Sequence, residues 1–62
     1  MTGTAMIKWL KKQGYTVDRI KGSHYHISKN DRRTVVPHHH KELHPKTYSS
    51  ILKDLGIEEA PK

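Results

Sequence analysis

Residues 15–29 read YTVDRIKGSHYHISK, which places a turn dipeptide between two strand-like segments. Gly22-Ser23 predicts a tight turn, because glycine accepts a positive φ without the steric penalty of a Cβ atom. The segments on either side, residues 15–21 and 24–29, then pair as the two antiparallel strands of a hairpin. This hairpin decides the fold, and it places His24 directly after the turn.

The second strand of the hairpin alternates between two faces. Tyr25 and Ile27 point to one face, since side chains alternate along a strand, and His24 and His26 point to the other. If Ile27 marks the face that packs against the core, the two histidines lie on the open face of the sheet or at its rim. We therefore expect a substrate to reach them there.

The first strand alternates less regularly. Tyr15 and Val17 have the parity of Arg19, whereas Ile20 has the opposite parity. This pattern has two interpretations. Either the strand is buried only at its start, or a β-bulge near Asp18 resets the alternation.

An amphipathic helix is predicted at each end of the chain. Residues 4–13 carry apolar side chains at helical spacing, with lysines facing away and Gly14 as the C-terminal stop. Trp9 lies at the edge of this apolar stripe, so we expect it to pack against the sheet rather than to stack on a base. The second helix is expected to begin near Pro45 and to end at Gly56. Its apolar stripe consists of Tyr48, Ile51, Leu52 and Leu55.

A third strand is predicted at residues 34–37, after a polar turn at residues 30–33. The order of the elements is thus α-β-β-β-α with hairpin connections. We therefore expect an α+β fold, a two-layer sandwich in which two helices cover one face of a three-stranded antiparallel sheet, like a double-stranded-RNA-binding domain (dsRBD-like). Residues 1–62 are expected to form this single domain, with residues 58–62 as a frayed tail.

The charge of the chain restricts its partners. Twelve Lys and Arg residues stand against six Asp and Glu residues, which gives a net charge of +6. Because the basic residues are spread along the chain, we expect a positive folded surface that suits nucleic acid or an acidic protein partner. No cysteine is present, which excludes disulfides and thiolate zinc sites. No apolar run approaches the ~20 residues of a membrane span, so we expect no membrane contact and a cytoplasmic location.

The residues around the predicted turn are suited to chemistry on RNA. An imidazole exchanges protons near neutral pH, so His24 is the candidate acid–base residue. The backbone N–H groups of Gly22 and Ser23 offer a place for a phosphate. Arg19 and Lys21 add positive charge beside them. A histidine beside a surface turn commonly has no chemical role, so this local motif does not establish catalysis by itself.

Five further histidines raise two other interpretations. His26 lies two residues along the same face and is the nearest candidate for a second acid–base group and an RNA contact. The run His38-His39-His40, together with His44, invites a metal site. A closed zinc site needs about four well-placed ligands, however, and no acidic cluster accompanies the run. We therefore expect a solvated loop, with no metal and no other cofactor.

Several short motifs follow one another in a definite order along the chain. They are Gly14-Tyr15 after a lysine-rich helix, Arg19 before Lys21-Gly22-Ser23-His24, Thr34-Val35-Val36-Pro37-His38, Lys41-Glu42-Leu43, Thr47 before Ser50-Ile51-Leu52-Lys53, and Gly56-Ile57. No single motif is specific, but the ordered set at this spacing resembles the HicA family, the toxins of HicA–HicB toxin–antitoxin systems. The resemblance covers nearly the whole chain.

This resemblance implies a small ribonuclease that cleaves messenger RNA and arrests growth until a HicB-type antitoxin binds it. It also implies the dsRBD-like fold, and it places the family's catalytic histidine on His24. We expect cleavage to need no metal, because RNA carries its own nucleophile in the 2′-hydroxyl. We expect acidic residues of the antitoxin to cover the face that carries His24. The residues expected around the RNA phosphate are Arg19, Lys21, Gly22, Ser23 and His26.

Two positions do not follow the family pattern directly. Lys46 stands where the family often has a glycine before Thr47, which is a difference at the start of the last helix. The family's loop histidine corresponds to either His38 or His39, because the length of the loop varies there.

The main alternative function is a non-catalytic RNA-binding module of the same fold, which holds phosphates and 2′-hydroxyls without cutting the chain. Whether an RNA is shortened on incubation distinguishes the two. A DNA-binding regulator is weaker, since neither predicted helix belongs to a helix-turn-helix pair.

Overall fold

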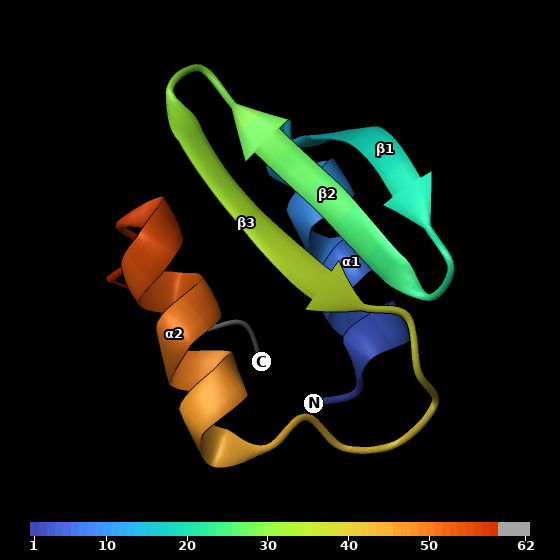
Figure 1. Ribbon diagram of the computed structural model, residues 1–62. Helices are drawn as coiled ribbons and strands as arrows, with labels where there is room; N and C mark the ends of the chain where they lie inside the picture. Colours follow the sequence, from blue (N-terminus) through green and yellow to red (C-terminus); the bar gives the residue numbers. More distant parts are fainter. Residues whose placement is uncertain (59–62) are drawn as a thin grey trace.

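The computed structural model describes residues 1–58 and has the element order α-β-β-β-α (Figure 1). Its elements are α1 (Gly3–Lys12), β1 (Thr16–Lys21), β2 (His24–Lys29), β3 (Arg32–Pro37) and α2 (Pro45–Leu55). This order and the open three-stranded antiparallel sheet confirm the predicted α+β fold. Of the tail predicted at residues 58–62, residues 59–62 lie outside the described part of the chain. No helix in the described part is long and apolar enough to cross a membrane.

The sheet is an antiparallel meander with the strand order β1-β2-β3. In the view of Figure 1, α1 lies behind the sheet, where it contacts β1 and β3, and α2 lies alongside β3. Both helices contribute side chains to one core on the same side of the sheet. The other side carries His24, His26 and Ser28 of β2, and we call it the open face.

A β-bulge at Asp18 resets the alternation of β1. Val17 pairs with Ile27, but the next pair is Arg19 with His26, so Asp18 is an extra residue in β1. The bulge of the second interpretation is therefore present, and the burial of the first also holds, because Val17 is the only residue of β1 that is not exposed. As a result, Val17 packs toward the core while Arg19 lies on the open face.

Side-chain hydrogen bonds hold the bulge in place. The hydroxyl of Thr16 donates to Oδ1 of Asp18 at 3.1 Å, and the hydroxyl of Ser28 donates to Oδ2. Because Thr16 and Ser28 face each other across β1 and β2, the carboxylate bridges the two strands where their regular pairing is interrupted.

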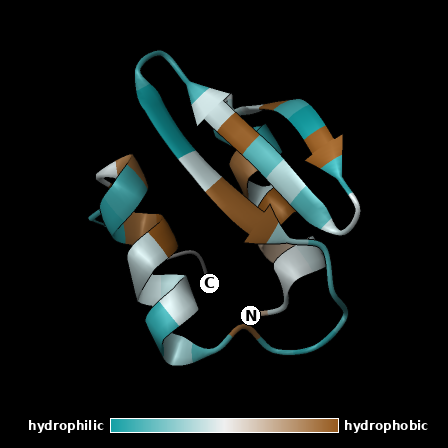
Figure 2. Ribbon diagram, in the orientation of Figure 1, coloured by the Kyte–Doolittle hydropathy of each residue, from teal (hydrophilic) through white to brown (hydrophobic). Residues whose placement is uncertain are grey.

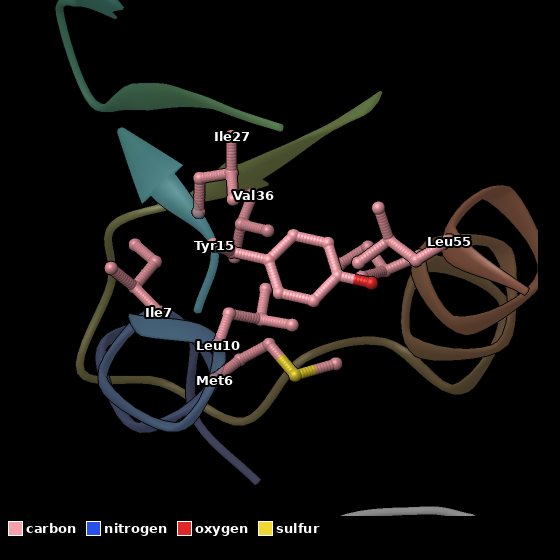
Figure 3. Packing of buried hydrophobic residues seen from close by; sticks show 8 residues of the cluster. Met6, Ile7, Leu10, Tyr15, Ile27, Val36 and Leu55 are labelled. Carbon is pink, nitrogen blue, oxygen red and sulfur yellow. The ribbon is translucent and has the colours of Figure 1, made fainter. Parts of the chain in front are cut away.

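The core lies between the sheet and the two helices (Figure 3). Its buried side chains are Met6, Ile7, Leu10, Tyr15, Ile27, Val36, Ile51 and Leu55. Each such side chain contributes about 1.5–3 kcal/mol by burial. Trp9 is half-buried and packs against this cluster, as predicted. Ile27 is only 1% exposed, which confirms that it marks the core face and that His24 and His26 point the opposite way.

Each hairpin turn consists of two residues. In the first turn, Gly22 has a φ of 61°, the positive value that the sequence predicted. The second turn is Asn30-Asp31, and Asn30 has a φ of 57°. The turn predicted at residues 30–33 was two residues too long, and the strand predicted at 34–37 was too short. The reason is that Arg32 and Arg33 pair with β2 despite their polar side chains.

The C-terminal end of α2 is fixed from two directions. Gly56 ends the helix in the left-handed conformation, and the N–H of Ile57 donates to the carbonyl of Leu52 at 2.9 Å. Arg32 donates from Nη1 to the carbonyl of Leu55, also at 2.9 Å. This last bond ties the end of α2 to the start of β3, so the helix runs antiparallel to the strand.

Gly3 lies buried at the start of α1, against the end of β3. A Cβ atom at this position would lie 1.9 Å from the carbonyl oxygen of Pro37. We therefore expect Gly3→Ala to lower the free energy of unfolding by about 1–3 kcal/mol, because the start of the helix must move away from β3. Urea unfolding followed by circular dichroism measures the change. The exposed substitution Ala5→Ser on the same helix should change this free energy by less than about 0.5 kcal/mol, and equal effects would contradict the close contact.

Candidate active site

His24 begins the central strand of the sheet, beside the first hairpin turn. Its backbone pairs with Lys21 on β1 and with Pro37 on β3. The side chain is exposed, and none of the side-chain hydrogen bonds or ion pairs among residues 1–58 involves it. Both ring nitrogens are therefore free to exchange a proton with a bound substrate.

The turn next to His24 is open to solvent and is hydrogen-bonded to the segment after β3. A Cβ atom on Gly22 would meet no other atom within 4 Å, so the space around this residue is open. The carbonyl of Ser23 accepts a hydrogen bond of 2.7 Å from the N–H of His38, which fixes the turn to the segment after β3. Within residues 1–58, the N–H groups of Gly22 and Ser23 donate to no turn or side-chain acceptor. They remain available to an anion.

Positive charge lies on the same face as the two histidines. Lys21 is paired with His24, and Arg19 is paired with His26. Both basic side chains are exposed, while His26 is half-buried. The bulge in β1 thus brings together four of the six residues that the sequence predicted for the site, and Gly22 and Ser23 adjoin them in the turn.

A groove of about 720 Å³ lies between the open face and α2. Its sheet side includes Arg19, His26, Arg33 and Val35, and its helix side includes Lys46 and Ser50. His24 does not line the groove, but it lies two residues before His26 on the same face, about 7 Å along the strand. This groove therefore lies next to the candidate catalytic residue, not around it.

Of the residues that line the groove, the sequence predicted only Arg19 and His26 for the site, and it missed Arg33, Val35, Lys46 and Ser50 among others. The groove exists because α2 packs beside β3 and so borders the open face. That placement depends on contacts between distant residues, such as the 3.3 Å hydrogen bond from Thr34 to Asp54. The one signal in the sequence was the spacing of Lys46, Ser50 and Asp54, which puts polar side chains on one stripe of the helix.

The histidines after β3 have separate surroundings. The ring of His38 stacks on Tyr25, with 4.7 Å between ring centroids and 13° between ring planes. His40 meets the edge of His38 at 6.4 Å. Because Tyr25 belongs to the core side of β2, the ring of His38 lies on the other side of the sheet from the open face. Figure 2 shows this loop as hydrophilic along most of its length.

His44 has a structural role at the start of α2. Its Nδ1 accepts a hydrogen bond of 3.1 Å from the N–H of Lys46, so it is the N-cap of the helix. Among residues 1–58, no group of three or more His, Asp or Glu side chains is arranged to hold a metal ion.

Comparisons with known proteins agree with the resemblance found in the sequence. A family model described as "HicA toxin of bacterial toxin-antitoxin" matches residues 3–57. A relative from Pseudomonas fluorescens (strain Pf0-1), named "Probable mRNA interferase HicA", is 42% identical over 53 residues. The aligned region covers 84% of this chain and 88% of that protein. No solved structure matches the chain significantly.

The N-cap interaction of His44 predicts how this position responds to substitution. We expect His44→Ala to lower the free energy of unfolding by about 0.5–1 kcal/mol, because the N–H of Lys46 loses its acceptor. His44→Asn should keep or raise the stability, since asparagine is a stronger N-cap residue. Thermal unfolding of both variants measures this. Equal destabilisation by Ala and Asn would mean that the imidazole is needed for something other than capping.

Proposed function

Because the chain belongs to the HicA family of toxins from bacterial toxin–antitoxin systems, we propose that it is an endoribonuclease of messenger RNA with His24 as its acid–base residue. The name of the Pseudomonas fluorescens relative, a probable mRNA interferase, supports the activity. The observation that carries the residue assignment is the position of His24, an exposed imidazole on the open face that is paired with Lys21 and follows an accessible turn. Its substrate, messenger RNA, implies action in the cytoplasm.

The proposed reaction uses the nucleophile that RNA itself carries. His24 accepts the proton of the 2′-hydroxyl as that oxygen attacks the neighbouring phosphorus, and the bond from phosphorus to the 5′-oxygen breaks. The products are a 2′,3′-cyclic phosphate and a free 5′-hydroxyl. A positioned acid–base group of this kind contributes about 10²–10⁴-fold to the rate. His26 is the candidate acid for the leaving 5′-oxygen, because it lies on the same face at about 7 Å along the strand.

The turn is proposed to stabilise the phosphate as its charge develops. The N–H groups of Gly22 and Ser23 and the ammonium of Lys21 supply donors and positive charge beside His24. Preorganised donors at such a position typically contribute as much as the acid–base group or more. Arg19 is proposed to hold the next phosphate of the RNA, since it stands beside His26. None of these steps requires a metal ion.

The proposed partner is a HicB-type antitoxin that presents acidic residues to the open face. The chain has an accessible surface of 4594 Å². A protein–protein interface of ordinary size takes ~800 Å² from each partner, about a sixth of this surface. An interface centred on the basic open face would therefore cover His24 as well. Complementary charge also accelerates capture, which suits a toxin that must be silenced soon after synthesis.

We expect His24→Ala to lower the rate of RNA cleavage by at least about 100-fold while the fold is retained. The exposed ring makes few contacts, so its loss should cost less than about 0.5 kcal/mol of stability. Gel analysis of a labelled RNA measures cleavage, and circular dichroism verifies folding. The matched control is His40→Ala, an exposed histidine whose ring lies beside His38 on the other side of the sheet, and it should cut RNA at the native rate.

The same assay in EDTA separates the proposed mechanism from its alternatives. Cleavage should continue in the chelator, because the 2′-hydroxyl and His24 supply the reaction. Loss of cleavage that added zinc restores would contradict the mechanism. A folded native chain that binds RNA but never shortens it would favour the non-catalytic binding module.

The antitoxin should compete with RNA for the open face. When the His24→Ala chain is saturated with a fluorescent RNA, addition of the antitoxin should release the RNA completely, because both ligands need the same basic side chains. Fluorescence anisotropy follows the release, and the exposed α1 substitution Lys12→Glu, away from the open face, should leave it unchanged. A stable ternary complex of toxin, antitoxin and RNA would contradict inhibition by occlusion.

A further inference from the structure

We propose that the groove between the open face and α2 binds one unpaired nucleotide of the RNA next to the scissile bond, so that the chain acts on single-stranded RNA. This proposal rests on the proposed function of His24 and extends it to the neighbouring part of the substrate. The groove is distinct from the turn that flanks His24, and its lining comes from β1, β2, β3 and α2.

The position of the groove suits a nucleotide adjacent to the one that is cut. His26 lines the groove and lies about 7 Å from His24 along β2. Lys46, at the first turn of α2, borders the end of the groove nearer to His24, because α2 runs antiparallel to β3. An RNA strand that crosses His24 therefore enters the groove with its next nucleotide.

The charges of the groove suit a phosphodiester chain. Arg19, Arg33 and Lys46 come from three different elements, are all exposed, and outnumber the two carboxylates of the lining, Asp18 and Asp54. The two arginines border the sheet side and Lys46 borders the helix side, so a strand within the groove passes between cations. Such contacts supply most of the affinity of proteins for single strands.

The floor of the groove suits a base. Val35 is a 43% exposed apolar side chain on the open face, where it is paired with His26 and lies between Arg33 and Pro37 of the same strand. The half-buried ring of His26 is paired with Val35 across β2 and β3 and makes no side-chain hydrogen bond among residues 1–58. An aromatic ring next to an apolar side chain is a surface on which any base stacks. The hydroxyl of Ser50 faces it from α2 and can bond the edge of the base or the 2′-hydroxyl.

The size of the groove favours an unpaired nucleotide over a duplex. Its volume of about 720 Å³ is that of a small-molecule site, large enough for one nucleotide. In an RNA duplex the bases are stacked and paired, so only phosphates and the shallow groove edges reach a protein surface. A base reaches Val35 and His26 only when it is unstacked.

The test compares two neighbouring serines of α2 in the catalytically silent His24→Ala chain. Ser50 lines the groove, whereas Ser49 is exposed on the same helix and does not line it. We expect Ser50→Tyr to fill the groove and to weaken binding of an unstructured RNA of about twelve nucleotides by roughly tenfold or more. Ser49→Tyr should change the affinity by less than about twofold. The blunt duplex of the same sequence should bind more weakly, and Ser50→Tyr should not affect it.

A second matched pair of variants tests the groove without adding a large side chain that could disturb the fold. Lys46 lines the groove and Lys53 does not, although both are exposed on α2. Lys46→Glu should therefore weaken binding of the single strand more than Lys53→Glu does. Equal effects within both pairs would overturn the proposal, as would a duplex that binds as tightly as the single strand.

Failure of this proposal and failure of the proposed function give different results. The binding assay uses a chain without His24, so it reports on the groove whether or not His24 is the catalyst. If the native chain cuts RNA and His24→Ala does not, while the serine variants bind alike, only the groove assignment is wrong. If His24→Ala still cuts RNA, the catalytic assignment is wrong and the groove is judged on the binding data alone.

Discussion

The bulge at Asp18 decides which side chains of β1 reach the open face. Without the extra residue, Arg19 would share the face of Val17 and point toward the core. With it, one short strand buries Val17 at its start and presents Arg19 and Lys21 beside the two histidines of β2. The interruption costs regular backbone pairing, which the carboxylate of Asp18 offsets by accepting one hydroxyl hydrogen bond from Thr16 within β1 and one from Ser28 on β2. The bulge also turns Ile20 to the core side of the sheet. Because β1 is an edge strand, this side chain stays 57% exposed there.

A second set of contacts connects the N-terminal helix to the candidate site. The buried Gly3 packs against the backbone of Pro37, and the N–H of Thr4 donates to the carbonyl of His39 at 3.1 Å. His38, between these two residues, donates its own N–H to the carbonyl of Ser23 in the turn. The start of α1 is therefore connected to the turn beside His24 through three consecutive residues of one segment. The position of the candidate catalytic ring depends on the packing of α1, although no residue of that helix lies on the open face.

The sequence predicted the elements whose causes are local. Gly22-Ser23 and the alternation around Ile27 were sufficient to place His24 and His26 on one face, and a bulge near Asp18 was one of two interpretations of an irregular strand. Its errors also have a local cause. Arg32 and Arg33 were assigned to a turn because they are polar, but a strand at the edge of an open sheet accommodates charged side chains while its backbone pairs.

The sequence did not predict the groove, because the groove depends on where α2 lies relative to the sheet. Periodicity shows which side of α2 is apolar, but it does not show that the helix packs beside β3 and borders the open face. The bonds from Arg32 to Leu55 and from Thr34 to Asp54 set that position, and both join residues that are about twenty positions apart. The groove is a product of this tertiary arrangement, so Val35 carries no local sign of a site, and Ser50 shows only its place on the polar stripe of α2.

Because side chains alternate along each strand, the residues that stabilise the fold and the residues proposed to act on RNA lie on opposite faces of the sheet. On β2, Tyr25 and Ile27 contribute to the core, while His24 and His26 between them face the proposed substrate. Under the proposed function, substitutions on the open face would therefore change binding and catalysis with little effect on folding, which suits a chain with so small a core. In the proposed function, RNA and antitoxin both bind the basic side chains of the open face. An added basic side chain that strengthens RNA binding would then also accelerate binding of an acidic antitoxin. Added positive charge would therefore not release the proposed ribonuclease activity from inhibition.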